Sequence, residues 1–522
     1  MDFYRLGLLL VACWLPLVSG LLPETIRIGG LFHQDRQRNH AELAFRFAIN
    51  RLNSQRALNG TTVVSDIRYV ADNSSFDATK TACRQLSTGV AAVFGPPTKG
   101  SASAVGSVCK SMGIPFVETR WEHEGRDALQ TSINLHPSNR HTSQAIRDVV
   151  YHYRWSAITI VYEEETALTR LQEVLRASAG PMRLKVAVYR LPSSPDMRSL
   201  LKEIKTSGAR HIIIDCRSQT LYPLLEQIME VQMLRSYYHY IFTSMDTSLL
   251  NMSRYSGDGV NITTLHMHDT ESPTYHQLVS EWRSRYRPVE GRPMEHAMTL
   301  EAALMYDAVN VLAKSFAGIS TSRNMTMQSL ACFQAPAKAW DDGLTLFNYL
   351  KSVEIREGLT GHVAFDNFGE RANPKIFISE LSDVIGMEQR GHWTVEEGVY
   401  MKPLPAGLIT NNTSFQNRTL VVTTILESPY IMRRDSVDGV PVTGNDRYYG
   451  YCIEMLAAIA KHIGFRYTIK EVEDNNYGSQ REDKTWNGMV EQLIQRKADL
   501  AVAPLTITYS REQVIDFSKP YM

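Results

Sequence analysis

The chain has 522 residues, of which 43% are hydrophobic and 21% are charged, so it can form about three or four folded domains and has no large disordered part. Its 55 lysines and arginines balance 55 aspartates and glutamates. A chain without net charge lacks the basic field that nucleic acid attracts, so we expect no nucleic acid among its partners.

Residues 1–20 have the pattern of a secretory signal peptide. Arg5 precedes an apolar run over 8–18, and small residues follow it. The run is too short to span a bilayer, so cleavage near Gly20 is predicted, with a buried strand or helix as the alternative. No later stretch of 18 apolar residues occurs, so we expect a chain in the secretory pathway with no membrane span of its own.

Apolar runs rich in β-branched residues alternate with helical periods from Thr25 onward. Strands are predicted at 26–32, 63–70, 90–94, 114–117, 157–162, 184–189, 212–214 and 240–243, and helices at 41–52, 77–86, 101–112, 166–178, 197–205 and 219–234. This order predicts right-handed βαβ units and parallel sheets. A boundary near 136–139 separates two series, which later segments at 299–316, 340–356, 362–366 and 375–381 complete. We expect two lobes of a clamshell with a ligand cleft at the carboxyl ends of the strands.

Two local motifs have a functional alternative. Phe94–Ser101 has the glycine spacing of a phosphate-binding loop but lacks a lysine after Gly100, so a tight strand-to-helix turn is predicted. The free N–H groups of that helix start could still hold a ligand carboxylate. His266 and His268 do not complete a metal site, so we predict solvated strand histidines, no metal and no cofactor. No motif of a catalytic nucleophile or metallohydrolase occurs, so no enzyme activity is expected.

Potential N-glycosylation sites cluster before the last part of the chain. The sequons begin at Asn59, Asn73, Asn251, Asn261, Asn324, Asn411, Asn412 and Asn417. Three within seven residues mark 408–418 as exposed. The predicted organisation is a signal peptide at 1–20, a bilobed domain at 21–400, a glycosylated linker at 401–418 and a third α/β unit at 419–522.

Five cysteines remain after removal of the signal peptide, so at least one is free or has a partner outside this chain. Cys216 and Cys452 lie in apolar runs and look like small buried hydrophobes. A secreted chain is expected to use a disulfide, but the spacing does not choose its pair. No C-x-x-C spacing occurs, so zinc is not expected.

The third unit carries several specific sequence phrases, namely Thr423–Tyr430 (TTILESPY), Trp486–Met489 (WNGM), Arg496–Thr508 (RKADLAVAPLTIT) and Arg511–Pro520 (REQVIDFSKP). Together they closely resemble the first ligand-binding segment of ionotropic glutamate receptors of the kainate class. Phrases at the front, among them Phe94–Pro96, Glu118–Trp121 and Tyr237–Phe242, resemble the amino-terminal domain of the same receptors. The resemblance therefore covers nearly the whole mature chain in consistent order.

The resemblance implies a periplasmic-binding-protein-like clamshell of type I, of the leucine-binding kind, that serves mainly to pair subunits. A periplasmic-binding-protein-like domain of type II would follow, incomplete in this chain. The resemblance also implies a disulfide between Cys83 and Cys332. Closing so long a loop would stabilise the fold by at most about 5 kcal/mol on the chain-entropy model.

In the resembled family, glutamate lies between the two lobes of the ligand-binding domain, and the matching positions are Tyr477, Pro504, Thr506 and Arg511. Arg511 would bind the α-carboxylate through a bidentate, charge-assisted pair. The Pro504 carbonyl would accept from the ammonium, and Thr506 would add a hydroxyl and an N–H group. Tyr477 would cover the ligand. Taken alone, Arg511 also fits a solvated charge at a helix start, and Tyr477 fits a turn aromatic.

The resemblance further implies ion binding at a dimer interface of the ligand-binding domains. The matching positions are Glu512, Ile515 and Asp516 for a cation, with an anion near Lys519. Carboxylate oxygens suit such a cation, although ordinary surface carboxylates are the alternative.

The family pattern continues past Met522 into a membrane pore and a second ligand-binding segment. We therefore expect that this chain alone conducts no ions, contacts the membrane only through a downstream region and has negligible glutamate affinity. The leading prediction is the extracellular part of a kainate-type glutamate-gated cation channel subunit at the postsynaptic membrane, assembled with other subunits as dimers and tetramers. The alternative is a secreted, truncated product that pairs with full-length subunits or synaptic partners. A receptor-cyclase ectodomain would share the bilobed front but not the phrases in 419–520.

Overall fold

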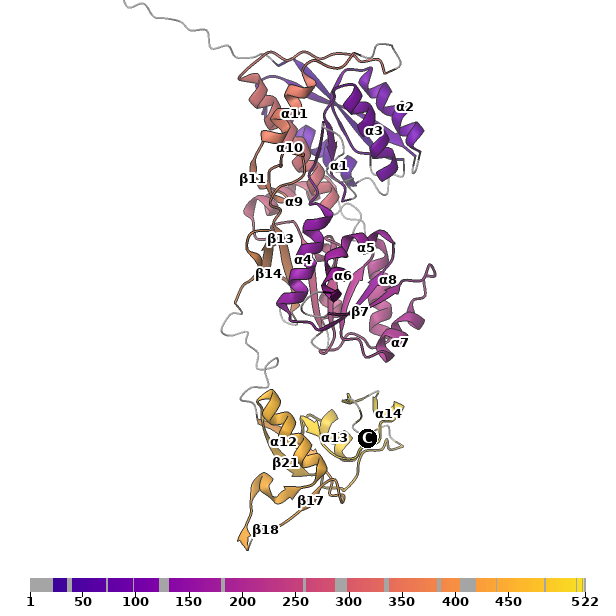
Figure 1. The fold of residues 1–522 in the computed structure, drawn as a ribbon, viewed down its shortest axis with the longest axis vertical. Helices are drawn as coiled ribbons and strands as arrows, with labels where there is room; N and C mark the ends of the chain where they lie inside the picture. The colour runs from indigo at the N-terminus through magenta and orange to yellow at the C-terminus, as the bar shows by residue number, and fades with distance from the viewer. Residues whose placement is uncertain are drawn as a thin grey trace, which may run out of the picture. The chain divides into compact units, whose positions relative to one another are not determined.

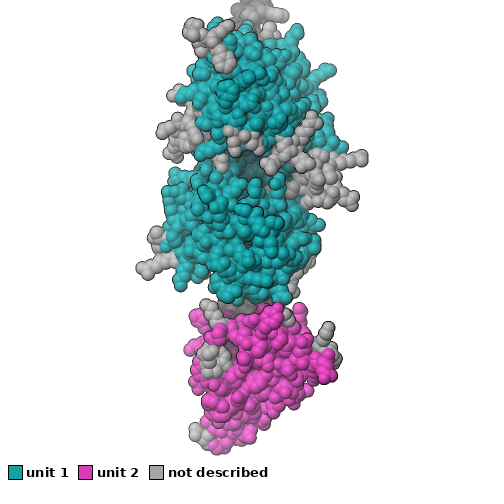
Figure 2. All heavy atoms as spheres, turned by 90° about the vertical axis from the view of Figure 1, so that its right-hand side faces the viewer, with its two compact units in different colours: residues 1–402 teal, residues 403–522 magenta. Residues whose placement is uncertain are grey.

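The structure is a computed structural model that describes residues 22–34, 40–71, 74–96, 98–121, 131–179, 184–256, 260–286, 298–332, 338–382, 386–403, 419–437, 439–482, 485–512, 514–518 and 520. The predicted signal peptide and most of the predicted linker lie outside these residues. The chain divides into unit 1, Met1–Lys402, and unit 2, Pro403–Met522. Both units are α/β folds (Figure 1), and Figure 2 shows the two units in different colours.

The first lobe of unit 1 is built on a five-stranded sheet in the order β2-β1-β3-β4-β5. All its pairings are parallel. The strands are β1 (Thr25–His33), β2 (Thr62–Val70), β3 (Val90–Phe94), β4 (Phe116–Glu118) and β5 (Ser132–Asn134). Every residue of β3 is buried, as expected for a parallel strand with helices on both faces. The connecting helices are α1 (His40–Ser54), α2 (Ser75–Leu86) and α3 (Lys99–Ser111).

Helices from later in the chain complete this lobe. They are α9 (Pro273–Arg285), α10 (Leu300–Ser320) and α11 (Gly343–Ser352). Phe47 of α1 contacts Trp282 of α9 and Tyr306 of α10, with ring centroids 5.4 and 5.9 Å apart. Figure 1 shows α10 beside α1, far from it in sequence. Because α10 is covered on most of its surface, it is apolar nearly all round rather than along one stripe.

The second lobe is built on an eight-stranded sheet in the order β15-β14-β13-β10-β9-β8-β6-β7. Its strands are β6 (Ala157–Tyr162), β7 (Lys185–Arg190), β8 (His211–Asp215), β9 (His239–Phe242), β10 (Asn261–His266), β13 (Ile376–Ser382), β14 (Gly386–Thr394) and β15 (Gly398–Met401). The first five pair in parallel, and the last three are antiparallel. Its helices are α4 (Asn139–His152), α5 (Thr166–Arg170), α6 (Gln172–Arg176), α7 (Arg198–Thr206) and α8 (Ser218–Glu230).

The chain crosses between the two lobes after β5, after β10 and after the short pair β11 (Ile355–Gly358) and β12 (Gly361–Val363). Arg371 joins the first and third crossings. Its side chain is 1% exposed and donates to the carbonyls of Leu135 and Thr360, at 3.1 and 2.6 Å. Burial lowers the pKa of Arg371 to about 10, so the group stays charged at neutral pH. The crossings are therefore fixed to one another by a buried cation.

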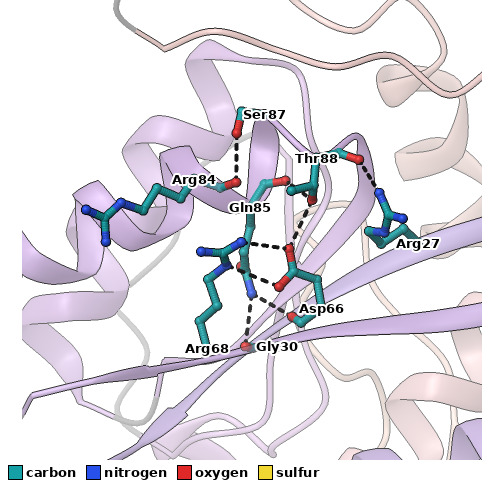
Figure 3. Close-up of polar contacts among 8 residues, drawn as sticks. All are labelled: Arg27, Gly30, Asp66, Arg68, Arg84, Gln85, Ser87 and Thr88. Carbon is teal, nitrogen blue, oxygen red and sulfur yellow. Dashed lines mark hydrogen bonds and ion pairs between the residues drawn. The ribbon is translucent and has the colours of Figure 1, made fainter.

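A buried glutamine fixes α2 to the first sheet (Figure 3). The amide of Gln85 donates to the backbone carbonyls of Gly30 in β1, at 3.0 Å, and of Asp66 in β2, at 2.7 Å. The Asp66 carboxylate in turn accepts from Thr88 just after α2, at 3.0 Å. On the same helix, Cys83 forms a disulfide with Cys332, the pair that the resemblance implied.

Unit 2 has a three-stranded parallel sheet in the order β21-β16-β22. Its strands are β16 (Thr419–Thr424), β21 (Arg466–Glu471) and β22 (Leu500–Ala501), and its helices are α12 (Tyr451–Ile463), α13 (Gly488–Ile494) and α14 (Tyr509–Glu512). Two antiparallel pairs accompany it, β17 (Met432–Arg433) with β20 (Tyr448–Tyr449) and β18 (Ser436–Val437) with β19 (Val440–Pro441). Val422, Cys452 and Met489 are fully buried in its core.

Most predicted elements are present, with some changes of extent. The predicted boundary near 136–139 is confirmed, because β5 belongs to the first sheet and α4 leads into the second. The predicted helix at 166–178 is instead two short helices that meet at Leu171. Strand β15 runs to Met401, and the Lys402 N–H donates to Arg390. Cys216 and Cys452 are buried, as predicted.

The prediction of solvated histidines in β10 is wrong. His266 and His268 are both fully buried. Nδ1 of His266 lies 2.8 Å from the His268 carbonyl, and its Nε2 lies 2.8 Å from Oγ of Ser379 in the neighbouring β13. Burial lowers the pKa of His266 to about 4 and that of His268 to about 3, so both are neutral. The cause is the return of β13 alongside β10, which no local pattern indicates.

Candidate ligand-binding site

The four predicted glutamate-binding residues lie in loops at one edge of the sheet in unit 2. Tyr477 is in the loop after β21, and Pro504, Thr506 and Arg511 follow β22. Since β16, β21 and β22 are parallel, these loops leave the carboxyl edge, where ligand sites of α/β folds usually lie. The structure brings Arg511 into contact with Thr506 and with Gly478, the neighbour of Tyr477.

Glycines and an aspartate shape the loop that carries Tyr477. Gly478 has a φ of +129°, and a Cβ there would lie 2.3 Å from Cγ2 of Val490, so only glycine fits without a shift. The Asp474 carboxylate accepts from the backbone N–H groups of Gly488, at 2.9 Å, and Asn476, at 3.3 Å. Burial raises the pKa of Asp474, but these hydrogen bonds outweigh it and hold the pKa below its usual value. The loop is therefore tied to the start of α13.

Arg511, in the single turn of α14, holds two loops together. Its Nε and Nη2 both donate to the Gly478 carbonyl, at 2.9 and 2.7 Å, and its Nη1 donates to the Thr506 carbonyl at 2.8 Å. Partial burial lowers the pKa of Arg511, but a guanidinium remains charged at neutral pH. Arg511 is therefore not the solvated charge that its helix start also allowed.

These contacts leave part of the guanidinium available. A guanidinium has five N–H groups, and three of them are used, so one remains on each terminal nitrogen. Both partners of Arg511 are neutral carbonyls, and among the described residues it forms no ion pair. Its positive charge is therefore uncompensated, and two donors suit the two oxygens of a carboxylate.

Thr506 and Pro504 offer further groups of the right kind. Thr506 is exposed, and among the described residues neither its N–H nor its hydroxyl has a hydrogen-bond partner. At Pro504 the chain makes a tight turn, in which the Leu505 N–H donates to the Ala503 carbonyl at 2.7 Å. The Pro504 carbonyl accepts no hydrogen bond within the same residues. The segment thus presents an acceptor and two donors close to the Arg511 cation.

Tyr477 contributes an aromatic face and an unpaired hydroxyl. Its ring is half-buried and packs against the core of unit 2. Its hydroxyl is buried and has no hydrogen-bond partner in the part of the chain that the structure describes. Leaving such a group unpaired costs about 1–3 kcal/mol. A ligand or water that reached this hydroxyl would recover that cost.

The sequence prediction omitted the residues that support this site. Gly478 supplies the carbonyl that Arg511 grips, and Asp474 with Gly488 fixes the loop. The dipeptide Asn487-Gly488 is a recognisable turn signal, and Gly488 has a φ of +66°. The partner of Arg511 is a backbone carbonyl, which every residue has. Residue types in the sequence therefore could not predict this contact.

The structure describes three of the four residues that were predicted to bind ions at a dimer interface. Glu512 and Asp516 are exposed and, among the described residues, form no ion pair. Ile515 is half-buried, and its N–H donates to the Arg511 carbonyl at 2.9 Å. Lys519 lies outside the described residues. No three His, Cys, Asp or Glu side chains of the described chain gather around a possible metal position. The ion sites stay a prediction.

The predicted glycosylation sites that the structure describes are accessible. Asn59, Asn251, Asn261 and Asn324 are all exposed, and Asn73, Asn411, Asn412 and Asn417 lie outside the described residues. Within the described ranges, no helix combines the length and the apolar character that a membrane crossing requires.

Comparison with known protein families gives two matches, one in each unit. Residues 40–383 match the family described as "Receptor family ligand binding region". Residues 418–522 match the family described as "Ligated ion channel L-glutamate- and glycine-binding site". Both are receptor ligand-binding regions rather than enzymes.

Similar curated proteins are the mouse and human proteins named "Glutamate receptor ionotropic, kainate 1". The mouse protein is 40% identical over 515 residues, which cover 96% of this chain and 60% of the relative. The human protein is 39% identical over 528 residues, which cover 96% of this chain and 56% of the relative. The chain thus spans well under two thirds of the length of these relatives.

Proposed function

This chain belongs to the kainate-type family of ionotropic glutamate receptors, and on that premise we propose that it is the extracellular part of a glutamate-gated cation channel subunit. Unit 2 binds the α-carboxylate of L-glutamate through Arg511. The observation that carries this proposal is the guanidinium held only by the Gly478 and Thr506 carbonyls, with one N–H left on each terminal nitrogen.

The contacts of the ligand follow from the groups around this cation. The carboxylate accepts from Arg511 and from the Thr506 N–H and hydroxyl, and the ammonium donates to the Pro504 carbonyl. The Tyr477 ring excludes water from one side of the ligand. Thr506 is exposed, so this wall binds glutamate tightly only when a second segment covers it. The greater length of the relatives supports such a segment.

Unit 1 is proposed to pair subunits on the extracellular side of the postsynaptic membrane. The match to a receptor ligand-binding region and the likeness to kainate receptors support this role. Phe76 in α2 and Leu344 in α11 are 79% and 60% exposed, and they offer apolar contacts to a second subunit. Sedimentation of the secreted chain at micromolar concentration should therefore give a dimer, and a persistent monomer would contradict this assignment.

A chimera tests the channel function directly. Residues 1–522 are joined to the remaining part of the mouse kainate 1 subunit, and currents are recorded from cells that express the product at the surface. We expect glutamate to evoke an inward current. Arg511→Lys keeps the charge but loses the planar fork, so it should raise the half-activating glutamate concentration by about a hundredfold.

The matched control is Arg466→Lys, because Arg466 is an exposed arginine at the start of β21, at the opposite end of that strand from the loop that carries Tyr477. It should leave the glutamate response unchanged. Equal effects of the two substitutions, or normal activation of the Arg511→Lys chimera, would contradict the proposal. The sequence of the natural transcript beyond codon 522 separates the channel subunit from the secreted alternative.

A further inference from the structure

Unit 1 contains a large cleft between its two lobes, separate from the site in unit 2. Its volume is about 850 Å³, within the range of small-molecule sites. Residues at the carboxyl ends of β1, β3 and β4 line it from the first lobe, and residues at the ends of β6, β8 and β9 line it from the second. The surface of unit 1 is hollowed between the lobes (Figure 2).

Most charges in this cleft neutralise one another. Arg170 donates from Nε and Nη2 to the two oxygens of Asp215, at 3.0 and 2.5 Å, and the Thr243 hydroxyl donates to the same carboxylate at 2.7 Å. Arg217 donates from Nε and Nη2 to one oxygen of Glu163, and its backbone N–H donates to the other. These groups have their partners within the protein and therefore do not select the charge of a ligand.

Two carboxylates that line the cleft lack a cation. Asp246, after β9, accepts the Leu300 N–H at 2.7 Å and forms no ion pair among the described residues. Glu301, in the first turn of α10, forms neither a hydrogen bond nor an ion pair there. Burial raises the pKa of Asp246 to about 6. Burial and then the charge of Asp246 raise the pKa of Glu301 to about 7.

The fold does not require a carboxylate at Glu301. Thr299 already caps α10, because its hydroxyl accepts the Ala302 N–H at 3.3 Å, and Asp246 satisfies the next free N–H. A second carboxylate beside Asp246 gains only the modest attraction of the helix start and repels Asp246, and its side chain has no hydrogen-bond partner among the described residues. Such a group at the wall of a cavity is explained by a positively charged partner that enters the cavity.

The wall next to these carboxylates is apolar. Leu304 and Met305 lie one turn after Glu301 on the same face of α10, and they are 0% and 1% exposed while lining the cleft. Met245 precedes Asp246 and is also buried. The cleft therefore offers negative charge next to hydrocarbon.

We propose that the interlobe cleft of unit 1 binds an organic amine, whose ammonium lies between Asp246 and Glu301 and whose hydrocarbon part lies along the apolar wall beside them. A bare divalent cation fits less well. Two carboxylates do not complete a cation shell of six to eight oxygens, and the cavity is far larger than an ion.

Calorimetric titration of the full chain tests this assignment. The probes are 2-phenylethylamine, the uncharged 2-phenylethanol, and Ca²⁺ alone. We expect saturable binding of the amine at up to millimolar concentration and none of the alcohol or of Ca²⁺. Glu301→Gln and Asp246→Asn should each weaken amine binding by about tenfold or more, since each removes one charge-assisted hydrogen bond.

The matched control is Glu164→Gln. Glu164 is an exposed carboxylate that lines the same cleft but has a cation, since Arg217 lies 3.5 Å from it. Its substitution should leave amine affinity within about twofold. Thermal melts confirm that each variant is folded. The proposal is overturned if the amine does not bind, if the alcohol binds equally well, if Ca²⁺ displaces the amine, or if Glu164→Gln weakens binding as much as Glu301→Gln.

Discussion

Arg170 in unit 1 and Arg511 in unit 2 occupy equivalent places, each beyond the carboxyl edge of a parallel sheet. Their partners differ. Arg170 is paired in bidentate fashion with the Asp215 carboxylate, which is 1% exposed. Arg511 is held by the neutral carbonyls of Gly478 and Thr506. The first arginine is therefore part of the fold, whereas the second has no carboxylate partner among the described residues and is the one proposed to bind a ligand.

On the two proposals made above, the two sites select ligands of opposite charge. In the cleft of unit 1, the lining arginines have carboxylate partners, whereas Lys99 forms no ion pair among the described residues. Asp246 and Glu301 remain without a cation there, so a cation is favoured beside these two carboxylates. In unit 2, one cation remains beside neutral donors, so an anion is favoured. Residue type alone does not separate these cases; the charge of the partner does.

The largest expected effect comes from breaking the pair in unit 1. Arg170→Ala leaves the buried Asp215 carboxylate without its cation, which should cost about 3 kcal/mol of unfolding free energy. Urea unfolding of unit 1 measures this loss. The control is Arg176→Ala, which removes an exposed pair with Glu173 and should cost about 0.5 kcal/mol or less. If both cost the same, Arg170 has no special structural role.

A smaller loss of stability is expected from a substitution at Gly478, whose carbonyl accepts hydrogen bonds from Arg511. Gly478→Ala places a Cβ against Val490 at a φ of +129°, so it should destabilise unit 2 by about 2 kcal/mol and weaken glutamate activation of the chimera. Gly439→Ala is the matched control, since Gly439 has a φ of +80° and no atom within 4 Å of the added Cβ. It should cost about 1 kcal/mol and leave activation unchanged. Equal effects on activation would show that the Gly478 carbonyl does not position Arg511.

The smallest effect concerns the unpaired carboxylate in the cleft. The folded state raises the pKa of Glu301 to about 7, so the folded protein binds a proton that the unfolded chain loses at lower pH. Stability therefore falls as the pH rises from about 4.5 to about 7. Glu301→Gln should remove this pH-dependent loss of unfolding free energy. Because solvent screens part of the charge, the expected gain for unit 1 is about 1 kcal/mol at pH 8, with no gain at pH 4. Melting temperatures at both pH values check this, and a gain of equal size at pH 4 would contradict it.

The alternation of strands and helices was predictable because buried parallel strands and amphipathic helices leave period patterns in the sequence. Strand β3 and helix α1 lie close to their predicted ranges. The burial of His266 was not predictable, since it depends on β13, which pairs with β10 from over a hundred residues later.

The candidate sites, too, depend on contacts that the sequence alone does not predict. Arg511, Thr506 and Pro504 could be proposed because family phrases contain them, and Tyr477 because its position matches the family. The hydrogen bonds from Arg511 to the Gly478 carbonyl depend on backbone geometry and could not be predicted. Asp246 and Glu301 each look like ordinary surface charges. Only the contact between the start of α10 and Asp246, in the segment after β9, brings them together in one cleft.

The most direct test of the central claim compares two ligands on two proteins. Half-activating concentrations of L-glutamate and of its α-amide are measured on the chimera with Arg511 and with Arg511→Lys. If the guanidinium binds the α-carboxylate, the amide should be about a hundredfold weaker on the parent, and the substitution should reduce that ratio to about tenfold or less. A ratio that stays near a hundredfold in Arg511→Lys would contradict the assignment of Arg511 to the α-carboxylate.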